Sequence, residues 1–236
     1  MIRALIVDDE LHAREELAAL LRDVGGCEIV AACANAVEAI KLINRQRPDV
    51  LFLDVQMPVL GGFELLGMID QEIMPHVVFV TAFDEYALKA FEEKTLDYLL
   101  KPVERGRLEK TFDKLHGLLN RGEPPFYAAP PIVRIPCGGG SRVKLINPRE
   151  VEHVRSDLSG VHIVLPQGEC YTELTLRVLE ERTALVRCHR QYLVNADHID
   201  EIHLLEHGLA EIRTRAGHLL PVSRRYLKSL KDSFGF

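Results

Sequence analysis

The chain has 236 residues, of which 47% are hydrophobic, and this length and composition predict two folded domains rather than a disordered protein. No apolar run approaches the roughly 18 residues of a membrane span, which argues against a membrane protein. The five cysteines form no CxxC pair, and no signal segment precedes the first predicted strand, which argues against a disulfide-rich secreted protein. We therefore expect a cytoplasmic protein. The net charge of −6 is uneven: residues 1–119 carry 13 Lys and Arg against 21 Asp and Glu, whereas residues 120–236 carry 16 against 14, as expected for a sensor or enzyme module joined to one that contacts a polyanion.

Five predicted strands alternate with five predicted helices in residues 1–119. The strands are Ile2–Val7, Glu28–Cys33, Val50–Leu53, His76–Val80 and Leu96–Leu100, and the helices are Glu10–Arg22, the segment from Asn35 to Ile43, Phe63–Ile69, Phe83–Glu93 and Glu104–Leu119. Four consecutive apolar residues, as in Val50–Leu53, are typical of a strand buried on both faces of a parallel sheet. Short alternating units connected by right-handed crossovers predict a doubly wound α/β domain.

Polar residues follow four of these strands. Asp8 and Asp9 follow the first, Asp54 follows the third, Thr81 ends the fourth and Lys101 follows the fifth. In open α/β sheets ligands bind outside the carboxyl ends of the strands, so these side chains are predicted to meet at one edge. A single Asp at such a position could simply cap a helix, but five functional groups together favour a chemical site.

This set of side chains matches the needs of phosphoryl transfer. Crowded carboxylates repel unless a cation lies among them, and Mg²⁺ prefers carboxylate, carbonyl and water ligands. Asp8, Asp9, Asp54 and the main-chain carbonyl of Gln56 could supply the protein ligands. Asp54 could then attack a phosphoryl group to form an acyl phosphate, while the hydroxyl of Thr81 and the ammonium of Lys101 bind the phosphate oxygens. We expect the peptide bond between Lys101 and Pro102 to be cis, so that the lysine turns back into the site.

These motifs resemble the receiver domain of bacterial two-component response regulators, which has a flavodoxin-like fold. The resemblance rests on the acid pair at 8 and 9, Asp54 followed by xxMP, Thr81 followed by Ala82, and YLLKP at 98–102. It implies that Asp54 is the phospho-acceptor, that Asp8, Asp9 and the Gln56 carbonyl bind Mg²⁺, that Thr81 and Tyr98 form a switch pair, and that Lys101 binds the phosphate. It also implies that phosphorylated receivers form homodimers through the segment Phe83–Leu119.

Residues 120–131 contain four prolines and no periodicity, and they predict a stiff, extended connector between domains at 1–119 and 132–236. The second domain shows short strand patterns separated by turn residues, with helical patterns only near Leu174–Arg182 and from Tyr226 onward. The predicted strands are Ile132–Pro136, Arg142–Ile146, Val151–Arg155, Val161–Leu165, Glu169–Glu173, His198–Leu204, Ala210–Thr214 and His218–Val222. This domain is therefore expected to be mostly β.

The residues that indicate a function for the second domain lie mainly in two segments, Leu185–Ile199 and Pro221–Leu230. Alternation along the first would place Arg187, His189 and Gln191 on one strand face, which could be an ordinary solvated face. The basic cluster of the two segments is nevertheless unusual, because no acid lies near it in the sequence, and phosphate contact would explain it. Its members are Arg187, His189, Arg190, Arg224, Arg225, Lys228 and Lys231.

These segments resemble the LytTR DNA-binding domain, whose loops enter successive major grooves of double-stranded DNA. By that resemblance Arg190 and Arg225 contact bases, and the loop Ser156–Val161, which carries no cation, is a third contact element. The whole chain resembles BtsR-type regulators through TAFDEYALKAFEEKTLDYLLKP and RCHRQYLVN. This resemblance implies a LytS-like sensor histidine kinase as partner.

We therefore expect a transcriptional response regulator in which phosphorylation of Asp54 promotes receiver pairing and binding to tandem DNA half-sites. An alternative is an enzyme, a phosphotransferase or phosphatase with an Asp nucleophile. Such an enzyme would require a second acidic residue two positions after the nucleophile, where this chain has Gln56. A receiver that controls an RNA-binding or protein-binding output is a third possibility that charge alone does not separate.

Overall fold

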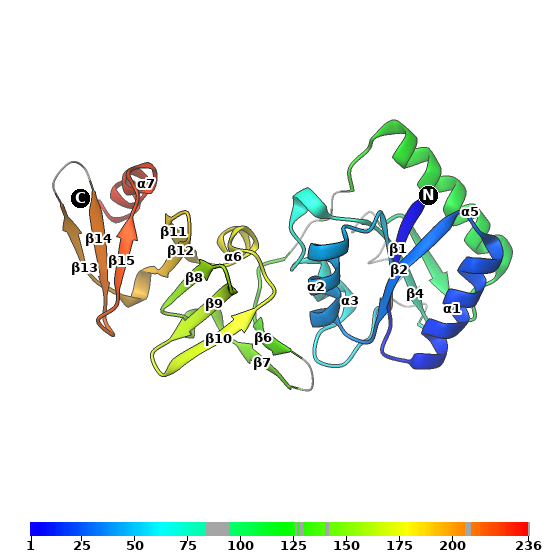
Figure 1. Ribbon diagram of the computed structural model, residues 1–236, viewed down its shortest axis with the longest axis horizontal. Helices are drawn as coiled ribbons and strands as arrows, with labels where there is room; N and C mark the ends of the chain where they lie inside the picture. The colour runs from blue at the N-terminus through cyan, green and yellow to red at the C-terminus, as the bar shows by residue number, and fades with distance from the viewer. Residues whose placement is uncertain (84–94, 126, 128–129, 140–141, 206–208, 236) are drawn as a thin grey trace. The chain divides into compact units, whose positions relative to one another are not determined.

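The computed structural model describes residues 1–83, 95–125, 127, 130–139, 142–205 and 209–235. The chain divides into two compact units, Met1–Pro130 and Pro131–Phe236 (Figure 1). Among the described residues, no helix is both long enough and apolar enough to cross a membrane.

The first unit contains a five-stranded parallel sheet in the order β2-β1-β3-β4-β5. Its elements are β1 (Ile2–Val7), α1 (Leu11–Val24), β2 (Cys27–Cys33), α2 (Ala36–Gln46), β3 (Val50–Leu53), α3 (Gly62–Leu66), a 3₁₀ turn (Gln71–Ile73), β4 (His76–Thr81), β5 (Asp97–Leu100) and α5 (Arg105–Arg121). The predicted doubly wound α/β fold is confirmed. The predicted helix Phe83–Glu93 lies, beyond Phe83, outside the described residues.

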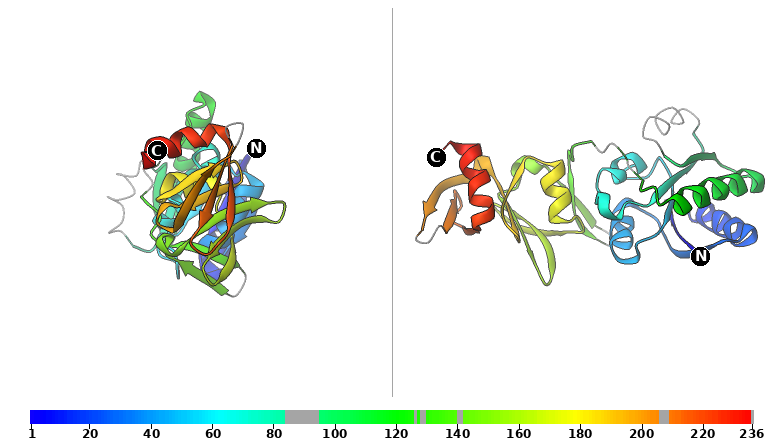
Figure 2. Two further views of the ribbon diagram at one scale, coloured as in Figure 1. Left: turned by 90° about the vertical axis from the view of Figure 1, so that its left-hand side faces the viewer. Right: turned by 90° about the horizontal axis from the view of Figure 1, so that it is seen from above.

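Helices cover both faces of this sheet, which explains why its central strands are apolar throughout. Every residue of β3 is buried. Figures 1 and 2 show α1 and α5 on one side and α2 and α3 on the other. Phe52 of β3 packs toward Phe112 of α5, with 6.3 Å between ring centroids, and Phe79 of β4 packs against Phe63 of α3 at 4.6 Å. A strand between two such layers has no solvated face.

A buried carboxylate holds α5 against the edge strand β5. The Asp97 side chain is only 6% exposed, and it accepts a hydrogen bond of 2.7 Å from Thr111 and ion-pairs with Arg107 at 2.8 Å and Lys114 at 3.1 Å. Burial alone would raise the pKa of Asp97, but the bonds from Thr111, Arg107 and Lys114 outweigh it and hold the pKa below its ordinary value. Asp97 therefore stays ionised and keeps α5 in place.

The proline-rich segment after α5 contacts the rest of the first unit. Gly122, at φ 64°, ends the helix, and the Gln71 side chain donates a 2.6 Å hydrogen bond to the carbonyl of Pro125. The Tyr127 side chain is 2% exposed, and its hydroxyl accepts a 2.8 Å hydrogen bond from the main-chain N–H of Val77. The start of the predicted connector is thus attached to the β4 side of the first unit by one buried aromatic residue.

The described residues of the second unit form antiparallel sheets in the orders β10-β9-β8-β12-β11, β13-β14-β15 and β6-β7. Its elements are β6 (Ile135–Gly139), β7 (Arg142–Ile146), a 3₁₀ turn (Pro148–Glu150), β8 (His153–Asp157), β9 (Gly160–Leu165), β10 (Gly168–Thr172), α6 (Leu176–Arg182), β11 (Leu185–His189), β12 (Tyr192–Asn195), a 3₁₀ turn (Ala196–His198), β13 (Ile199–Leu204), β14 (Ala210–Thr214), β15 (Leu219–Val222) and α7 (Arg224–Phe234). The mostly β prediction is confirmed.

Several predicted elements differ from the observed ones. The predicted strand Ile132–Pro136 lies at Ile135–Gly139, and the predicted strand Val151–Arg155 lies at His153–Asp157. The run 185–199, predicted as one alternating strand face, is a hairpin in which Arg187 of β11 faces Leu193 of β12 and His189 faces Tyr192. Its turn contains no Gly, Asn or Asp, so the usual hairpin signal is absent from the sequence. The last helix begins at Arg224, two residues earlier than predicted, and continues to Phe234.

A small core joins α7 to both larger sheets of the second unit. Its buried members are Cys188, Val194, Ala210, Ile212, Leu220, Val222 and Leu230. They come from β11, β12, β14, β15 and α7, and Figure 2 shows α7 lying along the three-stranded sheet. Because Leu230 is fully buried, the helix is held by its apolar face, and the opposite face with Arg224, Arg225 and Lys228 is left exposed.

Candidate functional site

The predicted acidic site forms at the carboxyl edge of the parallel sheet. Main-chain hydrogen bonds continue the strand pairing by one residue beyond the strands, from Asp8 N to the Cys33 carbonyl at 3.1 Å, from Asp54 N to the Val7 carbonyl at 2.8 Å, and from Lys101 N to the Thr81 carbonyl at 2.9 Å. The sheet itself therefore sets the positions of the functional side chains. The Lys101–Pro102 peptide is cis, as predicted.

Lys101 lies between two buried aspartates. Its Nζ is 2.6 Å from Oδ2 of Asp8 and 2.8 Å from Oδ2 of Asp54, and these two residues are only 4% and 7% exposed. Burial raises the pKa of Asp8 above its ordinary value, although the Lys101 hydrogen bond offsets part of the effect. Burial alone would lower the pKa of Lys101, but its bonds to Asp54 and Asp8 outweigh burial and raise it. The lysine is therefore a permanent cation in this site.

The predicted metal ligands lie together. Asp8, Asp9 and Asp54 each offer a carboxylate oxygen, and these oxygens lie within 4.8 Å of one another. Asp9 is exposed, so water can complete a coordination shell from that side. The main-chain N–H of Gln56 donates to Asp54 Oδ1 at 3.3 Å, which keeps the peptide that follows Asp54 close to the carboxylate. Oxygen donors of this kind, with access for water, fit Mg²⁺.

The predicted switch residues differ in environment. Thr81 is fully buried, and its hydroxyl oxygen has no hydrogen-bond partner among the described residues. Tyr98 is partly buried, and its hydroxyl donates to the main-chain carbonyl of Phe83, while its ring centroid lies 6.4 Å from that of Phe79. A buried hydroxyl without a partner costs free energy, so Thr81 has unused capacity to bind a polar group at the site.

Sequence analysis did not identify Gly62 as part of this site. A Cβ atom at Gly62 would lie 2.4 Å from the main-chain oxygen of Asp54 and 3.1 Å from both the Leu53 and Phe79 side chains. Gly62 is the first residue of α3, and its N–H donates to the Val55 carbonyl at 2.9 Å. Close packing of α3 on the loop that follows β3 therefore requires glycine here. The sequence offers no signal for this contact beyond the paired glycines themselves.

The two basic segments of the second unit lie side by side although residues 200–220 separate them in the sequence. The main-chain N–H of Ser223, at the start of α7, donates to the carbonyl of Cys188 in β11 at 3.0 Å. This bond places the exposed Arg224 and Arg225 next to the end of the hairpin where Arg190 is exposed. The guanidinium of Arg225 also lies 5.5 Å from the ring centroid of Tyr226.

Arg187 differs from the other members of the basic cluster. The prediction that no acid lies nearby is wrong for this residue, because its guanidinium ion-pairs with Glu180 of α6 at 2.8 Å and its side chain is only 12% exposed. It also donates to the carbonyl of Arg190 at 3.2 Å. The acid comes from the helix that precedes β11 in the chain, and spacing alone could not reveal this pairing. Arg187 thus braces the turn that carries Arg190.

His189 also contributes to the conformation of this turn. Its Nδ1 accepts a 3.2 Å hydrogen bond from the main-chain N–H of Gln191, and its ring lies 5.8 Å from that of Tyr192. Burial, followed by the charge of Arg190, lowers the pKa of His189 below its ordinary value. The imidazole is therefore neutral near pH 7 and adds little positive charge to the surface.

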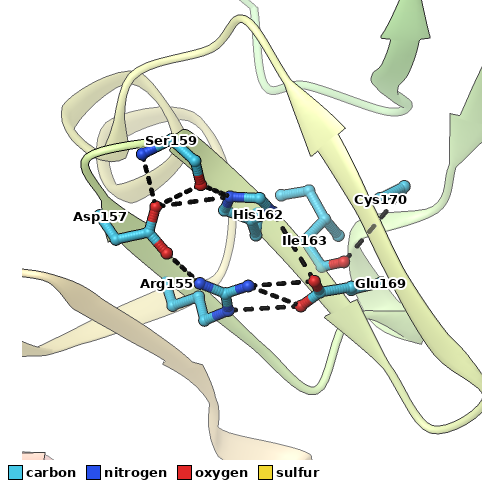
Figure 3. A network of polar contacts seen from close by, with 7 residues as sticks. All are labelled: Arg155, Asp157, Ser159, His162, Ile163, Glu169 and Cys170. Carbon is cyan, nitrogen blue, oxygen red and sulfur yellow. Dashed lines mark hydrogen bonds and ion pairs between the residues drawn. The ribbon is translucent and has the colours of Figure 1, made fainter.

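The loop Ser156–Val161 connects β8 to β9 and lies beside the same turn, since Ser156 N donates to the Gln191 carbonyl at 2.9 Å. Figure 3 shows the network that holds it, in which Arg155 pairs with Asp157 and with Glu169 at 3.0 Å. Hydrogen bonds from the Ser159 hydroxyl and N–H lower the pKa of Asp157 to about 2. The loop is therefore held by hydrogen bonds and ion pairs, and Asp157 is ionised near neutral pH.

Comparisons with known proteins agree with both parts of this description. Residues 4–113 match the model of the response regulator receiver domain, and residues 141–235 match that of the LytTr DNA-binding domain. An uncharacterized response regulatory protein of Vibrio cholerae is 54% identical over 236 residues, covering all of both chains. The transcriptional regulatory protein BtsR of Salmonella typhi is 53% identical and that of Escherichia coli K12 is 52% identical, each over 240 residues and the full length of both chains.

The close approach at Gly62 can be tested with a matched pair of glycine variants. Gly62→Ala should lower the free energy of unfolding by about 1–3 kcal/mol, because the added methyl group must displace main-chain atoms. Gly106→Ala, in the first turn of α5 where a Cβ atom would meet nothing within 4 Å, should be neutral or slightly stabilising. Calorimetry of the full chain would measure both. Equal midpoints for the two variants would show that α3 does not constrain the loop that follows β3.

Proposed function

Because the chain belongs to the LytTR family of two-component response regulators, with a receiver domain followed by a LytTR DNA-binding domain, we propose that a histidine kinase transfers a phosphoryl group to Asp54 and thereby controls promoter binding. The observation that carries this proposal is the ammonium of Lys101 placed between Asp8 and Asp54 at the sheet edge. The resemblance to BtsR-type regulators adds a LytS-like kinase as the proposed partner.

Each residue of the site has a role in this proposal. The carboxylate of Asp54 attacks the phosphorus, and the donor histidine leaves as the acyl phosphate forms. Asp8, Asp9, Asp54 and the main-chain carbonyl of Gln56 would hold Mg²⁺, which when bound offsets negative charge on the phosphoryl oxygens. Lys101 binds a phosphoryl oxygen as a charge-assisted hydrogen-bond donor.

We propose that Thr81 and Tyr98 transmit the effect of Asp54 phosphorylation to the surface of the receiver domain. The unpartnered hydroxyl of Thr81 supports a hydrogen bond to a phosphoryl oxygen once Asp54 is modified. Movement of Thr81 toward the phosphate alters the space beside Tyr98, whose hydroxyl contacts the Phe83 carbonyl two residues after Thr81. An enzymatic role is not favoured, because Gln56 occupies the place of the second acid that an Asp-based phosphatase would use.

The DNA contacts are proposed for the surface formed by the β11–β12 turn and the start of α7. Arg190, Arg224, Arg225 and Lys228 are exposed there. The first turn of α7 contains no acidic residue, and the side chain of Ser223 makes no capping bond, so the helix N-terminus is free to receive an anion. A phosphorylated homodimer would present two such surfaces to tandem half-sites of double-stranded DNA.

Phosphorylation can be tested with a small-molecule phosphodonor and Mg²⁺. The parent chain should gain one phosphoryl group that is stable in acid and labile in base, as expected for an acyl phosphate, and Asp54→Asn should gain none. Asp113→Asn, which removes an exposed carboxylate of α5, should be labelled like the parent. Intact-protein mass spectrometry would measure the three samples. Undiminished labelling of Asp54→Asn would move the acceptor to another residue.

Receiver pairing can be tested with beryllofluoride, which mimics the phosphoryl group. The edge strand β5 exposes Leu100 by 48%, and α5 presents charged side chains, as a pairing surface would require. The remainder of the predicted segment, residues 84–94, lies outside the described residues. Sedimentation velocity should show a larger dimer fraction with beryllofluoride and Mg²⁺ than without, and no such change for Asp54→Asn. An unchanged monomer fraction in the parent would contradict phosphorylation-driven pairing.

Base recognition can be separated from phosphate contact in the second domain. Arginine can bind the O6 and N7 acceptors of guanine, so Arg190→Ala or Arg225→Ala should cost about 1–3 kcal/mol on the operator and little on random DNA. Lys228→Ala or Lys231→Ala should weaken binding to both and reduce the salt dependence by about one unit of slope.

The matched control is Lys144→Ala, which removes an exposed positive charge from β7. It should leave both affinities nearly unchanged. Titrations at several salt concentrations would measure all variants on both duplexes. Equal losses on operator and random DNA for the two arginine variants would reduce them to phosphate contacts. Base recognition would then fall to the loop Ser156–Val161.

A further inference from the structure

A second group of metal-ligating side chains lies inside the DNA-binding domain. Glu152, immediately before β8, is fully buried, and the next residue, His153, is 4% exposed. His218 lies immediately before β15 and is half exposed, with 50% of its side chain accessible. One ligand atom from each of the three residues lies within 4.8 Å of the other two. This cluster joins the five-stranded sheet to the three-stranded sheet, and the proposed phosphorylation and DNA contacts make no use of it.

The contacts within the cluster leave one buried oxygen without a partner. Oε1 of Glu152 lies 2.6 Å from the Thr214 hydroxyl, 2.7 Å from Nδ1 of His218 and 3.3 Å from Nδ1 of His153. Oε2 of the same carboxylate is buried, and it has no hydrogen-bond partner among the described residues. Buried carboxylate oxygens are normally satisfied, so the unpartnered Oε2 indicates a missing ligand.

We propose that Glu152, His153 and His218 bind a divalent transition-metal ion of the zinc class. Two imidazoles and one carboxylate are the ligands of three-residue zinc sites, in which water takes the fourth position. Imidazole suits zinc, copper, nickel and iron, whereas Mg²⁺ prefers oxygen ligands, so this site and the acidic site of the receiver select different ions. The exposed edge of His218 gives the ion and its water a path from solvent.

The surrounding main chain already holds the ligands in place. Glu152 N donates to the Val164 carbonyl at 2.9 Å, and Asn195 N donates to the Glu152 carbonyl at 3.0 Å, so the carboxylate projects from the middle of a sheet. Thr214 donates its hydroxyl proton to Glu152 and accepts a 3.0 Å hydrogen bond from His218 N. One threonine therefore positions two of the three ligands, as outer residues do in metal sites.

The geometry also requires little movement to accept an ion. Ligand atoms bound tetrahedrally at about 2.0–2.1 Å lie roughly 3.3 Å from each other. The present distance from Oε1 to Nδ1 of His153, 3.3 Å, matches this value, and the 2.7 Å from Oε1 to Nδ1 of His218 would lengthen by about 0.6 Å. A Glu152 carboxylate that binds the ion through both oxygens would satisfy Oε2 as well as Oε1, whereas an ion pair between Oε1 and His218 leaves Oε2 without a partner. The pair of His203 and Glu201 on β13 is exposed and includes no such buried oxygen.

Zinc titration of the untagged full chain, with Mg²⁺ in excess to occupy the receiver site, tests the proposal. The parent should bind one Zn²⁺ in competition with a chromophoric chelator, and Co²⁺ should give the intense visible absorption of a tetrahedral site. His218→Ala should weaken this binding by well over tenfold, because even outer-shell changes cost about 10–100-fold. His203→Ala should bind as the parent does, since it removes an exposed histidine that also lies beside a carboxylate.

A second variant removes a ligand at the buried carboxylate, and its folding is checked separately. Glu152→Gln keeps the size of the buried side chain, and it should abolish tetrahedral Co²⁺ absorption while the circular dichroism spectrum remains that of the parent. If this buried change prevents folding, the exposed His218→Ala variant decides the question alone. Absence of Zn²⁺ binding by the parent, or equal binding by the parent and His218→Ala, would overturn the proposal. In the second case other surface histidines would be the zinc ligands.

Discussion

A single ammonium group shared by two buried carboxylates is the interaction on which the receiver site depends. Parallel strands all end at the same edge, so the acids that follow β1 and β3 must meet whether or not their charges are balanced. Asp8 and Asp54 are too buried for water to screen them, and Lys101 supplies the compensating charge at hydrogen-bond distance from both. A phosphoryl group on Asp54 would replace one of the lysine's two partners by a stronger acceptor. The same ammonium thus balances negative charge in both the unmodified and the phosphorylated form of the site.

Most of this site could be predicted from the sequence because its geometry follows from main-chain regularities. Apolar runs of four to six residues locate the strands, and the residue after each strand must lie at the edge. The contributions that depend on side-chain packing could not be predicted. Gly62 looks like a turn residue until α3 is placed against the Asp54 carbonyl, and Tyr127 looks like part of a free connector until its hydroxyl meets Val77.

The second domain was less predictable, since its contacts join distant segments through single bonds. The bond between Ser223 and Cys188 makes one surface of two basic stretches, and the spacing of the stretches in the sequence does not reveal this bond. Sequence analysis grouped Arg187 with the basic residues expected to contact phosphate, whereas Glu180 of the preceding helix forms an ion pair with it. Its role changes accordingly, because a paired and buried guanidinium can support the turn that carries Arg190 but has little freedom to reach a ligand.

The charges of α7 are arranged against the stability of an isolated helix. A helix N-terminus favours acidic groups by about 0.3–1 kcal/mol each, yet the first turn of α7 has Arg224 and Arg225 and no acid. The helix forms regardless, because Leu230 and Leu227 are held in the core between the two sheets. Burial of the apolar face therefore stabilises the helix, and the positive charges at its N-terminus remain unbalanced. An anion such as a DNA phosphate would balance the arginines and the helix dipole together, so an arrangement that is unfavourable in the free domain becomes favourable on binding.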